Sequence, residues 1–225
     1  MGQRSPLAHG RDADVYDLGD GRVLRRYRDG AEVAREAEVM RFVAGHGVPV
    51  PVISAASGGD LVMERLCGPT LLAALEAGQV RAVEAAQVLA DLHARLDAVP
   101  PRPGRTSREQ VLHLDLHPDN VMLEARGPVL IDWRNTTDGR RAVDVAMTAL
   151  ILAQVAVDGA DSRAAAAMDV LTQFVALVDR DTLTALDDAA ARRTGDPNLT
   201  GLERRLLPLA VSAVHRVGGA HPGTG

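Results

Sequence analysis

Lysine is absent from this 225-residue sequence, and cysteine occurs once. All 25 basic residues are therefore arginine, which is most simply a coding bias and by itself indicates neither a fold nor a site. The single cysteine, Cys67, has no intramolecular disulfide partner. A disulfide framework is thereby excluded, and we expect a cytoplasmic location.

The sequence also lacks an apolar run of the roughly 18–20 residues that a membrane-spanning helix needs, and its N-terminus shows no signal-peptide core. The net charge of -5 provides no overall basic field for nucleic acid. Hydrophobic residues make up 46% and charged residues 24%, as in ordinary soluble proteins. We therefore expect one large domain or two small lobes, with neither a membrane nor a nucleic acid as partner.

The first 65 residues predict short antiparallel strands around one helix. Gly19-Asp20-Gly21 separates two strand-like segments, 14–18 and 23–27, as in a β-hairpin. Residues 31–45 have a helical period. The prolines in 48–53 favour an extended backbone, and a further short strand is expected at 61–64, after a Ser-Gly-Gly-Asp turn.

Beyond Gly68-Pro69 the pattern becomes mainly helical. Residues 79–96 predict a long amphipathic helix whose buried face includes Val83, Leu89 and His93. A hairpin is expected at 121–131, and three or four helices follow from 142 to 217. The predicted fold class is thus α+β, with a small antiparallel-sheet lobe (1–65) that carries one helix and a mainly helical lobe (66–225).

Three polar residues near the predicted hairpin have the spacing that phosphoryl transfer needs. Asp115 precedes Asn120 by five residues, and Asp132 ends the second strand of the hairpin. One carboxylate can orient an attacking hydroxyl and accept its proton. An asparagine oxygen and a second carboxylate can hold the magnesium ion that bridges the phosphates. The hairpin would bring Asn120 and Asp132 together.

The segment His113–Asn120, followed by Ile131-Asp132-Trp133, resembles the catalytic and metal-binding loops of the aminoglycoside phosphotransferase and choline kinase group, which are relatives of the protein kinases. The resemblance extends from about Val15 to Asp144. It implies a two-lobed protein-kinase-like fold, ATP and Mg²⁺ as cofactors, and transfer of the γ-phosphate to a hydroxyl of a small molecule.

The resemblance also implies a role for individual residues. Asp115 matches the catalytic base, and Asn120 and Asp132 match the magnesium ligands. Asp144 resembles an aspartate that braces the catalytic loop, and Glu36 a helix glutamate that pairs with a strand lysine. The strand residue Arg25 is also expected to bind the nucleotide. So is a hinge whose backbone would hold the adenine, and this hinge comprises Met63, Glu64, Arg65 and Leu66.

The largest departure from the family pattern is at the strand lysine. Arg25 stands there, eleven residues before Glu36, with Arg26 as the rival position. Arginine offers a longer planar fork where lysine offers a compact charge. The segment 9–14, in the place of the phosphate-covering loop, is also poor in glycine. These departures leave open a second hypothesis, a nucleotide-binding module with weak or no transferase activity.

Only twelve residues separate Asp132 from Asp144, which leaves no long segment for a peptide substrate and favours a small hydroxylated acceptor. A third hypothesis starts from His113, Asp115 and His117. In an extended segment these three side chains would share one face and could form the metal site of a hydrolase. His113 is otherwise expected to be a buried histidine that shapes the loop.

Overall fold

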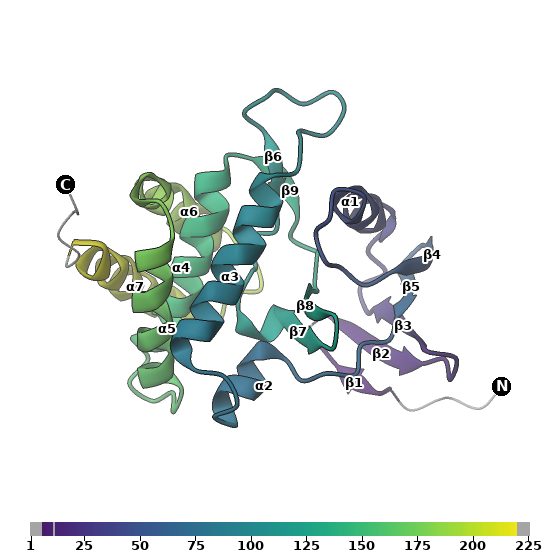
Figure 1. The fold of residues 1–225 in the computed structure, drawn as a ribbon, viewed down its shortest axis with the longest axis horizontal. Helices are drawn as coiled ribbons and strands as arrows, with labels where there is room; N and C mark the ends of the chain where they lie inside the picture. Colours follow the sequence, from purple (N-terminus) through teal and green to yellow (C-terminus); the bar gives the residue numbers. More distant parts are fainter. Residues whose placement is uncertain (1–5, 11, 220–225) are drawn as a thin grey trace.

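The structure, a computed structural model, describes residues 6–10 and 12–219. A five-stranded sheet with one helix forms one part, and a helical bundle forms the other (Figure 1). All neighbouring strands are antiparallel. The sheet order is β1 (Ala8–His9), β2 (Ala13–Asp17), β3 (Arg22–Tyr27), β5 (Asp60–Glu64) and β4 (Ile53–Ser57).

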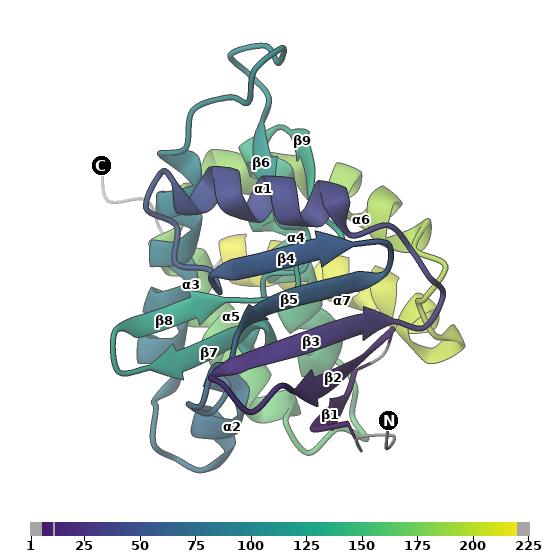
Figure 2. The same ribbon diagram turned by 90° about the vertical axis from the view of Figure 1, so that its right-hand side faces the viewer.

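The helix α1 (Ala34–Ala44) runs along the β4 side of the sheet (Figure 2). Its buried face carries Val39, Met40 and Val43, and also the carboxylate of Glu36. A buried carboxylate requires a partner, and the sheet supplies one from β3, as described below. The predicted antiparallel sheet with a single helix is thus confirmed.

Six α-helices of the second part are seen in the described residues: α2 (Leu71–Glu76), α3 (Ala82–Asp97), α4 (Arg141–Ala156), α5 (Ala164–Leu177), α6 (Leu186–Thr194) and α7 (Gly201–Gly219). The helix α4 is buried without interruption over 143–154, because α5, α6 and α7 pack against it and His93 of α3 contacts its Thr148. Short 3₁₀ turns, η1 (Pro118–Asn120) and η2 (Arg180–Ala185), complete the helical part. Over residues 6–10 and 12–219, no helix combines enough length with enough apolar character to cross a membrane.

Two ribbons extend from the bundle toward the sheet. The predicted hairpin consists of β7 (Val121–Glu124) and β8 (Gly127–Leu130). The second ribbon pairs β6 (Gln110–Leu112) with β9 (Thr137–Gly139), which lie far apart in the sequence. Together they hold the segments 113–120 and 131–136 on the side of the bundle that faces the sheet (Figure 1).

The segment that joins the two parts passes very close to the hairpin at Gly68. A Cβ atom on Gly68 would lie 1.8 Å from the carbonyl oxygen of Leu123. The amides of Cys67 and Gly68 both donate to the Glu124 carboxylate at 2.7 Å, and the amide of Leu123 donates to the Pro69 carbonyl at 2.8 Å. Only glycine permits this approach.

We therefore expect Gly68→Ala to lower the free energy of unfolding by about 2–3 kcal/mol, because the connection must move away from the hairpin. Urea denaturation measures the loss. Gly159→Ala is the matched control, since a Cβ there meets no atom within 4 Å. Equal stability of the two variants would contradict the close approach.

Candidate active site

A cavity of about 1300 Å³ lies between the sheet and the helical bundle. Of the nine residues for which sequence patterns predicted a role in catalysis, in nucleotide binding or as a metal ligand, eight line it. They are Arg25, Met63, Glu64, Arg65, Leu66, Asp115, Asn120 and Asp132. The ninth, Glu36, does not line the cavity but forms an ion pair with Arg25, which does.

The loop that carries Asp115 is anchored by Asp144 of α4. The carboxylate of Asp144 accepts hydrogen bonds from the amides of His113 (3.0 Å) and Leu114 (2.6 Å), which confirms the expected brace. Leu114 has a φ of 64°, in the left-handed region that a leucine rarely occupies. Such strain is found where the surroundings over-determine the backbone, and here it turns Asp115 toward the cavity.

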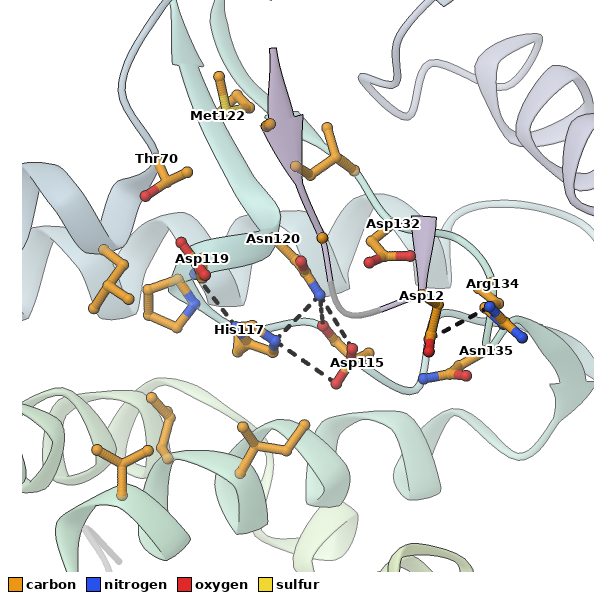
Figure 3. Close-up of a pocket in the computed structure, with 18 of the residues that line it drawn as sticks. Asp12, Thr70, Asp115, His117, Asp119, Asn120, Met122, Asp132, Arg134 and Asn135 are labelled. Atoms are coloured by element: carbon orange, nitrogen blue, oxygen red, sulfur yellow. Dashed lines mark hydrogen bonds and ion pairs between the residues drawn. The ribbon is translucent and has the colours of Figure 1, made fainter. Parts of the chain in front are cut away.

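Asp115 is positioned by its neighbours in the same loop (Figure 3). The Asn120 amide nitrogen donates to the Asp115 backbone carbonyl at 2.8 Å and to its Oδ2 at 3.2 Å. The Nε2 of His117 lies 3.7 Å from Asp115 Oδ1 and 3.2 Å from the Asn120 amide nitrogen. These contacts hold a carboxylate that is 22% exposed and faces the open cavity.

The hairpin brings Asp132 to the same place. Because Val121 pairs with Leu130, Asn120 and Asp132 emerge at the same end of the two strands, and the amide of Ile131 donates to the carbonyl of Asn120 at 2.9 Å. Asp132 has a φ of 61°, a second left-handed residue at this site. Its side chain is 40% exposed and lines the cavity.

The buried rings of His113 and Trp133 pack against each other and connect the loop of Asp115 to the loop of Asp132. His113 is fully buried, its Nε2 lies 3.0 Å from the Ile131 carbonyl, and its ring contacts Trp133 edge-on with centroids 4.8 Å apart. Trp133 is also fully buried and donates to the carbonyl of Leu130. Burial lowers the pKa of His113 to about 4, so the ring is neutral at physiological pH. The prediction of a buried, loop-shaping His113 is confirmed.

Arg25 joins the sheet, α1 and the hairpin. Its Nη1 donates to Glu36 Oε1 at 3.0 Å, and its Nη2 to Asp132 Oδ1 at 2.5 Å. The Tyr27 hydroxyl donates to the other Glu36 oxygen at 2.7 Å, and the guanidinium carbon of Arg25 lies 4.8 Å from the Tyr27 ring centroid. The rival Arg26 instead pairs with Asp60 and is 54% exposed.

The charges of this cluster depend on one another. Burial raises the pKa of Glu36, and Arg25 only partly offsets it. Burial also acts to raise the pKa of Asp132, but Arg25 outweighs burial there and holds that pKa below its usual range. Burial acts to lower the pKa of Arg25, yet the two carboxylates leave it above its ordinary value. The guanidinium is therefore a permanent cation at the wall of the cavity.

The hinge residues Met63, Glu64, Arg65 and Leu66 line the cavity. The amides of Glu64 and Arg65 donate to the carbonyls of Val52 (2.8 Å) and Gly21 (2.9 Å). The Glu64 carboxylate is turned to Arg126 and to the amide of Val52. In the part of the chain that the structure describes, the amide of Leu66 makes no backbone hydrogen bond.

The loop in the place of the phosphate cover carries an acidic group. Of the segment 9–14, Arg11 lies outside the described residues. Asp12 lines the cavity and lies 3.4 Å from Nη1 of Arg134, a residue that sequence patterns did not single out. Arg134 also pairs with Asp29 at 2.5 Å, and its guanidinium carbon lies 4.6 Å from the Tyr27 ring centroid. It thus connects the segment after Asp132 to the sheet.

The oxygen donors at the hairpin suit magnesium better than zinc. Asp132 offers a carboxylate, and Asn120 uses its amide nitrogen within the loop, so its Oδ1 could serve as a second ligand. Among the described residues there is no group of three or more His, Cys, Asp or Glu side chains that could hold a metal ion. The hydrolase site expected from alternation of His113, Asp115 and His117 is not favoured, since Leu114 breaks the extended backbone and His113 faces the interior.

Sequence reasoning missed the residues that the last helices bring to Asp115. Arg193 from α6 lies with its Nη1 3.9 Å from Asp115 Oδ1. Its Nε donates to Gln154 of α4 at 2.9 Å. These residues follow Asp115 by 78 and 39 positions, and no local motif marks them.

Comparisons with known proteins identify the family and the fold of the chain. A family model described as "Phosphotransferase enzyme family" matches residues 3–102 and 67–186. The comparison with curated proteins gave no significant match.

Solved structures share the fold at low sequence identity. The ADP-bound aminoglycoside phosphotransferase APH(2'')-Ib is 13% identical, with a TM-score of 0.61 over 96% of this chain and 92% of that one. Amicoumacin kinase hAmiN, in complex with AMP-PNP, Ca²⁺ and Ami, is 13% identical, with a TM-score of 0.59 over 94% and 87%. A thermostable mutant of APH(4)-Ia, in ternary complex with ADP and hygromycin B, is 14% identical, with a TM-score of 0.54 over 99% and 95%. The predicted two-lobed kinase-like fold is therefore confirmed.

Proposed function

The chain belongs to the phosphotransferase enzyme family, and from that premise we propose that it transfers the γ-phosphate of ATP to a hydroxyl group of a small molecule. The observation that supports this most is the convergence of Asp115, Asn120 and Asp132 on one cavity, from a loop and a hairpin. Similar structures hold ADP or AMP-PNP, which supports ATP as the donor here. A cytoplasmic location fits both ATP dependence and the single cysteine.

The nucleotide would lie between the lobes 1–65 and 66–225. The adenine would meet the hinge, where the amide of Leu66 is the available donor and the amides of Glu64 and Arg65 are already engaged. Met63 would border the base, since it lines the same wall of the cavity. Arg25 would face the phosphates, held in place by Glu36.

Asn120 and Asp132 would hold Mg²⁺, since one carboxylate and one amide oxygen leave room for phosphate oxygens in its coordination. Bound there, the ion would supply positive charge against the phosphates. Arg25 donates a hydrogen bond to Asp132 Oδ1 in this structure. For that oxygen to bind Mg²⁺, the guanidinium would turn from Asp132 toward the phosphates.

Asp115 would act on the acceptor. Its carboxylate accepts the hydroxyl proton as the acceptor oxygen bonds to the γ-phosphorus, while the bond from that phosphorus to the bridging oxygen breaks and ADP leaves. The Asn120 amide keeps the carboxylate aimed at the cavity. Most of the rate gain comes from positioning and charge, because the protein forms no covalent bond of its own.

The acceptor would be a small hydroxylated molecule. The interval 132–144 contains only turns, β9 and the first turn of α4, which leaves no platform for a peptide. The similar structures include an aminoglycoside phosphotransferase in complex with hygromycin B and an amicoumacin kinase in complex with Ami. The family match does not favour the rival hypothesis of a weak nucleotide-binding module, although that module would be compatible with the ion pair between Arg25 and Asp132.

Calorimetric titration of AMP-PNP, with and without Mg²⁺, tests this proposal. We expect binding that Mg²⁺ strengthens in the wild type and that loses this dependence in Asp132→Ala. Asp169→Ala is the matched control, because Asp169 is exposed on α5. No binding at millimolar nucleotide, or the same Mg²⁺ dependence in all three proteins, would contradict the proposed site.

A further inference from the structure

The cavity continues past Asp115 between α4, α5, α6 and α7, on the side away from the hinge. Four carboxylates of α4 to α7 and their connecting loops line this extension, Asp158, Asp161, Asp196 and Glu203, and two more, Glu76 and Asp119, lie near its Arg163. Two arginines, Arg163 and Arg193, line it as well. Under the proposed function, this extension is where the acceptor would lie, because it begins at the proposed base.

Each of the four carboxylates already has a partner within the chain. Asp158 Oδ1 accepts from the amide of Ala160 at 3.1 Å, and Asp196 Oδ1 from the amide of Asn198 at 2.9 Å. Glu203 accepts from the amide of Thr200 at 2.7 Å. Asp161 binds Arg163 through both of its oxygens, at 2.9 and 2.6 Å. An ammonium group on an acceptor would have to compete with these bonds.

Arg193 is the cation nearest to the reacting position. Its side chain is 12% exposed, and its Nε is fixed by the buried amide of Gln154. Its Nη1 lies 3.9 Å from Asp115, and its Nη2 lies 3.7 Å from Glu203. Both distances exceed hydrogen-bonding range, so these contacts are ion pairs that leave N–H groups able to donate to an oxyanion.

Arg163 adds a second positive charge at the rim. Besides Asp161, the carboxylates of Glu76 and Asp119 act to raise the pKa of Arg163, which places it among three acids. The chain therefore supplies one cation beside Asp161 and another between Asp115 and Glu203. A cationic group on an acceptor would compete with a resident arginine at both of these positions.

We propose that the acceptor carries an oxyanion, a carboxylate or a phosphate, close to the hydroxyl that is phosphorylated, and that Arg193 binds this group as the specificity-determining residue. A guanidinium fixed at its Nε presents two parallel N–H donors, which match the two oxygens of a carboxylate or phosphate. The inference rests on the proposed phosphotransfer, because Asp115 defines which hydroxyl reacts.

The test uses three open-chain six-carbon polyols that differ only at one end: D-gluconate (anionic), D-glucitol (neutral) and D-glucamine (cationic). Each is titrated calorimetrically into protein saturated with AMP-PNP and Mg²⁺. We expect gluconate to bind at least about tenfold more tightly than glucamine, with glucitol between them. D-Glucose 6-phosphate then distinguishes a phosphate from a carboxylate as the preferred oxyanion.

The variants separate specificity from folding. Arg193→Gln is expected to remove the preference for gluconate over glucitol, and Arg193→Lys, which keeps the charge, to retain part of it. Arg192→Gln makes the same charge change on the exposed side of α6 and should leave the preference intact. Thermal midpoints confirm that the proteins compared are folded.

Three outcomes would overturn the inference: glucamine binding as tightly as gluconate, no detectable binding of gluconate, or an unchanged gluconate preference in Arg193→Gln. The same samples report AMP-PNP binding first. Loss of that signal in the wild type would refute the proposed function itself, whereas normal AMP-PNP binding with no anion preference would refute only the role of Arg193.

Discussion

Replacing Asp115 by Asn is expected to lower phosphate transfer by about 10²-fold or more while ATP affinity stays nearly unchanged. Asparagine keeps the size of the side chain and a hydrogen-bond acceptor for the Asn120 amide. It cannot accept the hydroxyl proton at physiological pH. The loss should therefore be confined to the chemical step, because the side-chain contacts that hold Asp115 come from His117, Asn120 and Arg193 and not from the hinge.

Acceptor-dependent release of ADP measures the rate, and calorimetry measures the affinity for ATP with Mg²⁺. Asp169→Asn serves as the control for removal of one carboxylate from the helical part. Equal losses of ATP binding and turnover in Asp115→Asn would count against a role as the base, since they would indicate that Asp115 supports the nucleotide.

Replacing Arg25 by Leu is expected to lower the free energy of unfolding by about 3 kcal/mol, because a buried carboxylate loses its cation. Glu36 is 6% exposed and would keep only neutral partners, the Tyr27 hydroxyl and the backbone amide of Trp133. Asp132 is 40% exposed and can be hydrated once Arg25 is gone. The expected loss in the free energy of unfolding is therefore at the lower end of the range for a broken buried ion pair. Urea denaturation measures the stability, and ATP titration should show weakened binding as well.

The Arg25→Lys variant separates the effect of the positive charge from that of the planar guanidinium. A lysine can pair with Glu36 yet cannot bridge two carboxylates with a planar fork, so Asp132 should become more available to the metal. We expect this variant to recover most of the stability and to preserve or raise the transfer rate. A collapse of activity would mean that the guanidinium itself contacts the phosphates in a way that an ammonium group cannot. Activity in Arg25→Lys alone, with an inactive wild type, would support the weak nucleotide-binding module.

Much of the fold followed from local patterns. The Gly19-Asp20-Gly21 turn predicted the β2–β3 hairpin, and it lies between Asp17 and Arg22. The helical period placed α1 and α3 within a few residues of their ends. Such signals are strong because the turn chemistry or the period is contained within one short segment.

Elements that depend on distant partners were not predicted. The ribbon of β6 and β9 pairs Leu112 with Thr137, and Thr137–Gly139 has no apolar alternation to mark a strand. The helix α2 is only six residues long, too short for a periodic signal. Val83 was expected on the buried face but is 42% exposed, because it lies in the first turn of α3 and burial begins at Ala85.

The site residues likewise fall into those that local sequence patterns predicted and those that depend on packing between distant elements. Asp115, Asn120 and Asp132 were found because one loop and one hairpin contain them, and their roles stay a prediction until tested. The choice of Arg25 over Arg26 needed the sheet, which directs one side chain to Glu36 and the other to solvent. Arg193 needed the packing of α6 against α4, which no short motif encodes.

The most direct test of the central claim is phosphorus-31 NMR of the protein with ATP, Mg²⁺ and a panel of hydroxylated acceptors that includes the polyols above. The account predicts a new phosphomonoester signal that grows in step with ADP, requires an acceptor, and is nearly absent with Asp115→Asn. ATP that binds in the cavity yet never yields a phosphomonoester with any acceptor, in the wild type or in Arg25→Lys, would contradict a phosphotransferase that acts on a small molecule.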